Sequence, residues 1–91
     1  MKNHNILWDS KLKPKIIVVM PAFNAEKTVK KTYTDLPLDL IDEVILVDDA
    51  SKDKTLDIAR RLGITVYSHK QNKGYGGNQK TCYKEALKRN P

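Results

Sequence analysis

The chain has 91 residues, of which 40% are apolar and 31% charged, and its net charge is +6. This composition is typical of one small globular domain and excludes a disordered tail. No apolar run approaches the roughly 20 residues of a membrane span. Residues 1–15 lack the apolar core of a signal peptide. The chain has a single cysteine, Cys82, which excludes an internal disulfide and a zinc site. We therefore expect a cytoplasmic protein, or one on the cytoplasmic face of a membrane.

Three apolar runs predict three strands after a polar lead-in at residues 1–14. They are expected at Ile16–Met20, with Pro21 closing the first, at Val44–Val47 and at Ile64–Tyr67. Continuous β-branched runs of this kind fit strands buried on both faces, as in a parallel sheet covered by helices.

Each expected strand is followed by a helix. The first has Asn24 as its N-cap and ends at Pro37, and the second is capped by Ser51 or Asp53 and stops at Gly63. The third, Gln79–Arg89, follows a flexible loop at residues 73–78. The residues expected to face the sheet are Val29, Tyr33, Leu36, Leu56, Ala59, Leu62, Cys82, Ala86 and Leu87.

The order β-α-β-α-β-α predicts an α/β fold with three layers, a Rossmann-like parallel sheet between helices, over residues 15–91. Right-handed crossovers place the carboxyl ends of the strands on one edge of the sheet. That edge gathers residues 21–24, residues 48–51 and the glycine loop into one crevice. Ligands of open α/β sheets bind in such a crevice.

Two adjacent acids, Asp48 and Asp49, follow the second strand. Side chains of neighbouring residues diverge, so we expect one carboxylate to bind a base or ribose while the other braces the loop. The alternative is that both cap the helix that follows.

The loop Lys73-Gly74-Tyr75-Gly76-Gly77-Asn78 can bring backbone N–H groups close to a phosphate, or it can be an ordinary turn. Lys73 and Lys80 could meet a diphosphate or be solvated, and Tyr75 could stack on a base or cover the loop. His69, which follows the third strand, could approach the crevice, but we expect it to be a partly exposed structural residue, and we expect Cys82 to be core.

Acidic and basic residues are unevenly spread. Residues 39–57 hold seven acids and two bases, whereas residues 58–91 hold eight bases and one acid. The basic segment suits a phosphate-bearing partner and equally suits solvated helix faces.

Three motifs in order resemble the start of the family-2 inverting glycosyltransferases, which have the GT-A fold. They are Ile-Ile-Val-Val-Met-Pro-Ala-Phe-Asn-Ala-Glu-Lys-Thr-Val, Asp-Glu-Val-Ile-Leu-Val-Asp-Asp-Ala-Ser-Lys-Asp-Lys-Thr and Asn-Lys-Gly-Tyr-Gly-Gly-Asn-Gln-Lys, and the resemblance spans about residues 15–88. The fold it implies is the N-terminal half of GT-A.

The resemblance implies a UDP- or GDP-sugar donor, with a role in building cell-envelope polysaccharide. The residues it assigns to the nucleotide are Pro21, Ala22, Phe23, Glu26, Asp48, Asp49, Lys73 and Gly74. Asp49 matches the base-recognising aspartate of the family. Where the family has Asn-Glu-Glu this chain has Asn24-Ala25-Glu26, so Glu26 is the remaining candidate for a ribose contact from that loop.

The chain departs from the family in lacking an Asp-x-Asp motif. In family members these carboxylates hold Mg²⁺ or Mn²⁺ on the donor diphosphate, and a later acid is the general base that deprotonates the acceptor. We therefore expect no catalytic and no metal-binding residue here, and no transferase activity from this chain alone. The whole protein would transfer a sugar with inversion to a lipid, a glycan or another acceptor. An uncovered sheet edge would favour self-association.

Two other classes of protein share some of these features. A phosphoacceptor receiver domain places its acidic pair after the first strand, which here ends in Met20-Pro21. A non-catalytic nucleotide- or nucleic-acid-binding α/β module would explain the basic segment. It would leave the acidic crevice unexplained, and the six aromatic residues form no stacking pattern. We therefore expect no nucleic-acid partner.

Overall fold

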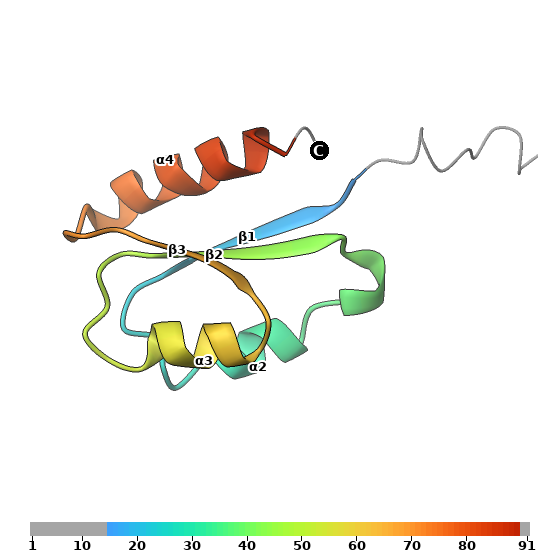
Figure 1. Cartoon of the computed structure of the whole chain (residues 1–91), viewed down its shortest axis with the longest axis horizontal. Coiled ribbons are helices and arrows are strands. Elements are labelled where there is room, and N and C mark those ends of the chain that lie inside the picture. The colour runs from blue at the N-terminus through green and yellow to red at the C-terminus, as the bar shows by residue number, and fades with distance from the viewer. Residues whose placement is uncertain (1–14, 90–91) are drawn as a thin grey trace, which may run out of the picture.

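A computed structural model describes residues 15–89, so the lead-in expected at residues 1–14 lies outside the described residues (Figure 1). The elements are β1 (Ile17–Ala22), α2 (Val29–Thr34), the 3-10 helix η1 (Leu38–Leu40), β2 (Glu43–Asp48), α3 (Thr55–Arg61), β3 (Thr65–Ser68) and α4 (Gly74–Leu87). The predicted order β-α-β-α-β-α is confirmed.

The three strands form one parallel sheet with β2 between β1 and β3. The register pairs Ala22 with Asp48 and Asp48 with Ser68, so the last residues of the three strands lie side by side. The carboxyl ends of the strands therefore share one edge of the sheet, as the crossover rule predicts.

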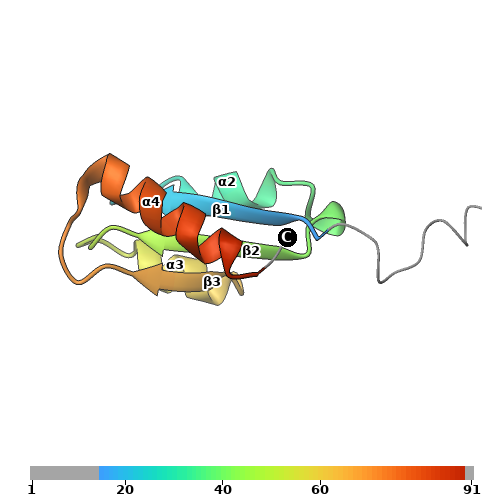
Figure 2. The same ribbon diagram turned by 90° about the horizontal axis from the view of Figure 1, so that it is seen from above.

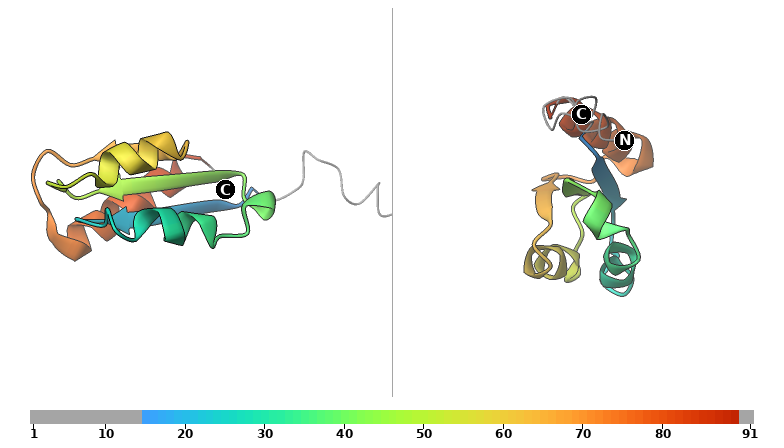
Figure 3. Two further views of the ribbon diagram at one scale, coloured as in Figure 1. Left: turned by 90° about the horizontal axis from the view of Figure 1, so that it is seen from below. Right: turned by 90° about the vertical axis from the view of Figure 1, so that its right-hand side faces the viewer.

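Helices cover both faces of the sheet, which makes three layers. α2 and α3 lie together on one face and α4 lies on the other (Figures 1 and 3). After β3 the chain turns back, and α4 runs over β1 and β2, as Figure 2 shows from above. This reversal of direction is typical of doubly wound, Rossmann-like sheets.

The core lies on both sides of β2. Ile45, Leu46 and Val47 are fully buried. Leu46 packs toward α2 and α3 with Val29, Ala59 and Ile64, whereas Ile45 and Val47 pack toward α4 with Cys82. The prediction of strands buried on both faces is confirmed for β2. Among the helices that the structure describes, none has the length and apolarity needed to cross a bilayer.

Two boundaries near β1 differ from the prediction. β1 continues through Pro21 to Ala22, because within residues 15–89 β1 pairs only with β2 and a proline on an edge strand costs no ladder hydrogen bond. Asn24 does not cap α2, which begins at Val29; its φ is +48° and its Oδ1 accepts the N–H of Lys52.

The N-cap position of α3 is Lys54, which makes no side-chain cap hydrogen bond, so neither Ser51 nor Asp53 is the N-cap that we predicted. Asp53, one residue earlier, still bonds to the first turn. Its Oδ1 accepts the backbone N–H of Thr55 at 3.0 Å, which satisfies one free donor of the first turn. Gly63, with φ of +83°, follows the helix, as expected for a glycine in the left-handed conformation after a C-cap. Of the apolar residues predicted to face inward, Ala59 is fully buried and Leu62 packs against the core. Ile58 packs against the core instead of Leu56, which was predicted to do so.

The largest difference from the prediction is the glycine loop. The segment expected to be a flexible loop is instead the first turn of α4, which begins at Gly74. The inward stripe of α4 is also more polar than predicted: Leu87 is 55% exposed, whereas Asn78, Cys82 and Glu85 are buried.

Ion pairs explain the burial of Glu85 at the end of α4. Arg89 donates to Glu85 and, through Nε, to Glu43 of β2 at 3.0 Å. Its second terminal nitrogen donates to the hydroxyl of Tyr67 in β3 at 2.9 Å. The C-terminal end of α4 is thus fixed to the sheet by charge, so Leu87 is not needed in the core.

Candidate functional site

A pocket of about 390 Å³ lies at the carboxyl edge of the sheet. The residues lining it come from the ends of β1 and β2, from the β3–α4 loop and from the start of α4: Pro21, Ala22, Phe23, Asp49, Asn72, Gly74, Tyr75 and Asn78. Five of the eight residues predicted to bind a ligand are among them: Pro21, Ala22, Phe23, Asp49 and Gly74. The predicted crevice is therefore present in the structure.

Asp48 is fully buried and faces away from this pocket into the β2–α3 turn. Its carboxylate accepts the backbone N–H of Ser51 at 2.8 Å and also the Ser51 hydroxyl. The Ser51 oxygen in turn accepts the N–H of Asn24 at 2.7 Å. Asp48 therefore braces the turn and ties it to the loop after β1, which is the bracing role expected for one acid of the pair.

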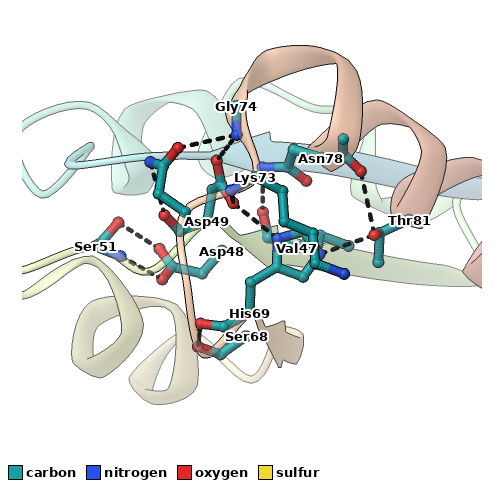
Figure 4. A network of polar contacts seen from close by, with 12 residues as sticks. Val47, Asp48, Asp49, Ser51, Ser68, His69, Lys73, Gly74, Asn78 and Thr81 are labelled. Carbon is teal, nitrogen blue, oxygen red and sulfur yellow. Dashed lines mark hydrogen bonds and ion pairs between the residues drawn. The ribbon is translucent and has the colours of Figure 1, made fainter.

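Asp49 lines the pocket, and its carboxylate accepts three hydrogen bonds (Figure 4). Oδ1 accepts the N–H of Lys73 at 2.7 Å and a ring hydrogen on Nδ1 of His69 at 2.8 Å, and Oδ2 accepts the N–H of Gly74 at 2.9 Å. The Lys73 N–H holds the pKa of Asp49 below its ordinary 3.8; His69 and Gly74 act in the same direction, and burial opposes them.

A carboxylate has about four acceptor positions, so the three donors on Asp49 leave one position, on Oδ2. An ionised carboxylate only accepts hydrogen bonds. The free position can therefore accept a hydrogen bond from an N–H or O–H group of a ligand in the pocket. It repels a ligand atom that presents a lone pair.

The same contacts explain why α4 begins at glycine. Asp49 and the Oδ1 of Asn72 both accept the N–H of Gly74, the latter at 2.9 Å, so the helix N-terminus is capped from outside the helix. Gly74 has φ of +78°, which glycine adopts without strain. A Cβ on Gly77 would lie 2.6 Å from Cβ of Lys73, so this position also requires glycine.

His69 is not the partly exposed residue that we predicted. Its side chain is 8% exposed, and its imidazole lies between Asp49 and Thr81, with Nε2 at 2.8 Å from the Thr81 hydroxyl (Figure 4). Three side chains from β2–α3, β3–α4 and α4 thus form one hydrogen-bonded row. Thr81 was not singled out from the sequence, because only its long-range partner distinguishes it from other helical threonines.

Two asparagines were also missed. Asn72 donates from Nδ2 to the carbonyl oxygen of Asp49 at 3.2 Å. The buried Asn78 donates to the carbonyl oxygens of Val47 at 3.1 Å and Ala22 at 3.5 Å, which holds the first turn of α4 on the strand ends. A local signal existed for Asn72 alone, since asparagine two residues before glycine is typical of a side-chain cap.

Residues 17–89 match the model of glycosyl transferase family 2. The chain belongs to this family. The match covers all of the described strands and helices, and thus the whole pocket. The family resemblance noted from the three motifs is confirmed.

Two curated proteins of known source are similar to this chain. An uncharacterized protein of Methanocaldococcus jannaschii is 40% identical over 87 residues, which is 96% of this chain and 36% of that protein. A UDP-N-acetylglucosamine–dolichyl-phosphate N-acetylglucosaminyltransferase of Methanococcus voltae is 33% identical over 88 residues, covering 78% of this chain and 35% of that protein. The chain thus spans about a third of the length of these relatives. No solved structure matches.

Three of the residues that the family-2 motifs assign to the nucleotide lie outside the pocket: Glu26, Asp48 and Lys73. Glu26 accepts the N–H of Lys54 at 2.9 Å through Oε1, and its own N–H donates to Asp53. The Lys73 side chain lies beside Gly77 and borders a separate hollow with Ser68 and His69. The backbone of Lys73, and not its ammonium group, is what reaches Asp49.

The divalent ion of family-2 enzymes does not fit the described residues. Within residues 15–89 there is no group of three or more His, Cys, Asp or Glu side chains arranged to hold a metal. The two acids at the sheet edge already accept hydrogen bonds from backbone and hydroxyl donors. We therefore assign no metal-dependent step to this part of the protein.

Proposed function

We propose that this chain binds the nucleotide part of a UDP- or GDP-sugar donor, for a family-2 glycosyltransferase that transfers the sugar with inversion. The observation that carries the proposal is the pocket at the sheet edge, where Asp49 keeps one acceptor position beside Phe23 and Gly74. Uracil N3–H and guanine N1–H are donors of the kind that this position accepts. Phe23, which is 52% exposed, offers an apolar surface for a base.

The finer parts of the proposal concern the whole protein. The acceptor we propose is a lipid or glycan, and the Methanococcus voltae relative, whose name specifies dolichyl phosphate, supports the lipid class. For the whole protein we propose Mg²⁺ or Mn²⁺ on the donor diphosphate and an acid as general base, as the family resemblance implies; within residues 15–89 no group of His, Cys, Asp or Glu side chains is arranged to hold the metal. We place the protein in the cytoplasm or on the cytoplasmic face of a membrane, in cell-envelope polysaccharide synthesis, and we expect no sugar transfer by the 91-residue chain alone.

The proposal is tested by two-dimensional NMR titration of the full chain with UDP and with GDP. Saturable shifts are expected at Ala22, Phe23, Asp49 and Gly74, all of which line the pocket. Phe23→Ala is expected to weaken binding, whereas Leu40→Ala, which removes a side chain that is 63% exposed on η1, is the matched control.

Two results would contradict the proposal. One is a folded protein that shows no shifts with either nucleotide. The other is salt-dependent retention on DNA together with the absence of nucleotide binding, which would favour the nucleic-acid-binding alternative. Sugar transfer by the purified chain, with donor and metal supplied, would contradict the expectation that it is inactive alone.

A further inference from the structure

We infer that His69, held at Nε2 by Thr81, is the positioning residue for base recognition: it fixes the Asp49 carboxylate so that only the free position on Oδ2 meets the base. The inference rests on the proposed function and deepens it. It assigns to His69 and Thr81 a part in the choice between bases that carry an imino N–H, uracil and guanine, and bases that do not, cytosine and adenine.

The two carboxylate oxygens of Asp49 accept different numbers of hydrogen bonds. Oδ1 accepts from Lys73 at 2.7 Å and from His69 at 2.8 Å, so both of its acceptor positions are filled. Among the donors of residues 15–89, only the N–H of Gly74 bonds to Oδ2, at 2.9 Å. The Asp49 side chain, which is 3% exposed, borders the pocket at the sheet edge.

The hydrogen bond between His69 and Asp49 has one direction. The ionised carboxylate of Asp49 can only accept, so Nδ1 must carry the hydrogen. The Thr81 hydroxyl, which also donates to the carbonyl oxygen of Gly77 at 3.2 Å, lies 2.8 Å from Nε2 and holds that end of the ring. Thr81 therefore opposes a turn of the imidazole, which would place the Cδ2–H group instead of the Nδ1–H group against Asp49.

The hydrogen-bonded row of Asp49, His69 and Thr81 connects three elements of the fold. His69 directly follows β3, Asp49 directly follows β2, and Thr81 lies in α4, so the row fixes the carboxylate relative to three separate elements (Figure 4). Without His69, Oδ1 would regain an acceptor position. The carboxylate could then rotate, so that either Oδ1 or Oδ2 accepts the hydrogen bond from a ligand. A base that donates one N–H would then be held less tightly and distinguished less well.

The test compares two pairs of nucleotides that differ in the base edge, UDP with CDP and GDP with ADP, on the full chain. We expect wild-type protein to prefer the imino-bearing member of each pair by roughly tenfold in Kd, which corresponds to about one net hydrogen bond to a charged group. His69→Leu removes both ring hydrogen bonds and should reduce this preference to about twofold or less. His69→Asn places an amide N–H near the position of Nδ1 and should keep most of the preference.

Thr81→Val and Thr34→Val form a matched pair. Each threonine hydroxyl bonds to a carbonyl of its own helix at 3.2 Å, Thr81 to Gly77 and Thr34 to Lys31, but of the two only Thr81 also contacts His69. Thr81→Val should lower the preference for UDP over CDP by roughly threefold, and Thr34→Val should leave it unchanged. If His69→Leu does not fold, this pair still tests the inference.

A measurement without nucleotide separates positioning from general instability. Amide hydrogen exchange at Lys73 and Gly74, which donate to Asp49, should be faster in His69→Leu than in wild type and near wild type in His69→Asn. An unchanged preference for UDP over CDP in His69→Leu would overturn the inference and leave the proposed function intact. Failure of the wild-type chain to bind any of the four nucleotides would overturn the proposed function, and the inference with it.

Discussion

Two regions at the carboxyl edge of the sheet use their polar groups in opposite ways. In the first, the β1–α2 and β2–α3 loops satisfy each other: the N–H groups of Asn24, Ala25 and Glu26 donate to Ser51, Thr55 and Asp53, and those of Lys52 and Lys54 donate back to Asn24 and Glu26. In the second, the β3–α4 junction converges on one carboxylate, Asp49, which keeps an acceptor position. The first region is closed and structural, and the second is open to a ligand.

The adjacent acids Asp48 and Asp49 are divided between these two regions. Asp48 points into the closed loops and Asp49 into the open junction, because successive side chains at the end of β2 diverge. Their substitutions should therefore affect different properties, stability in one case and ligand binding in the other.

The largest expected effect follows from Asp48→Ala in the closed region. It leaves the partly buried N–H and hydroxyl of Ser51 without their acceptor, so we expect a loss of about 3 kcal/mol in the free energy of unfolding, measured with urea. Asp35→Ala is the control; its exposed ion pair with Lys31 should contribute about 1 kcal/mol or less. A similar loss for the two variants would show that the loops are not tied through Asp48.

In the open region, Gly77→Ala is expected to cost about 1–3 kcal/mol by overpacking. The added Cβ would meet Cβ of Lys73 at 2.6 Å and push away the N–H that Asp49 accepts. Gly76→Ala is the matched control, since nothing lies within 4 Å of the Cβ position there. Alanine at position 76 should instead stabilise α4 by up to about 1 kcal/mol through helix propensity. Equal effects at both positions would contradict this account of the junction.

Much of the open region was predictable from the sequence. The apolar runs located the strands, and the parallel order placed residues 21–23, Asp49 and Gly74 at one edge, where the pocket lies. These inferences rest on local periodicity and on the handedness of the crossovers, and both are properties that the sequence carries directly.

The remaining features depend on partners far apart in the chain. The low helix propensity of Gly-Tyr-Gly-Gly predicts a loop, but Asp49, 25 residues before Gly74, caps this segment as a helix. No local sequence pattern indicates that Thr81 contacts His69. Nor does one indicate that the carboxylate of Glu26 accepts the backbone N–H of Lys54. A motif places a residue near the site, whereas the hydrogen bonds of the whole fold decide whether that residue remains available to a ligand.

Acid should weaken both regions, and ligand binding should distinguish them. The pKa of Asp49 is lowered by Lys73, His69 and Gly74, and that of Asp53 by Thr55 and Glu26 although burial opposes. A lowered pKa in the folded state means that the stabilisation is complete above the ordinary 3.8 and is lost as the pH falls through the lower folded value. We expect Asp49→Asn and Asp53→Asn each to flatten the fall in urea midpoint between about pH 5 and pH 2.

The two variants should differ in their response to nucleotide. Above pH 5, UDP should raise the urea midpoint of Asp53→Asn as it does that of wild type, because Asp53 lies in the closed loops. It should not raise the midpoint of Asp49→Asn, which lacks the ionised acceptor. Equal protection of both variants by UDP would remove the distinction between a closed and an open region.

The smallest expected effect concerns the far side of the first α4 turn. There an open groove of about 720 Å³ runs between α4 and the edge of β1, lined largely by apolar atoms of Val19, Pro21, Cys82, Tyr83 and Ala86. Within the described residues β1 has no second neighbour, so we propose that two copies associate weakly along this edge. Tyr83→Lys, at a side chain that is 70% exposed, should weaken self-association by roughly tenfold in sedimentation experiments.

Leu40→Lys is the control for the edge, because Leu40 is 63% exposed on η1 and does not line the groove. A wild-type chain that sediments as a monomer up to millimolar concentration would contradict association. If association is found, UDP should leave it unchanged, since the groove shares only Pro21 with the pocket that Asp49 lines. A strong effect of UDP on self-association would instead show that α4 couples its two sides, so that the open region extends through the helix to the edge of β1.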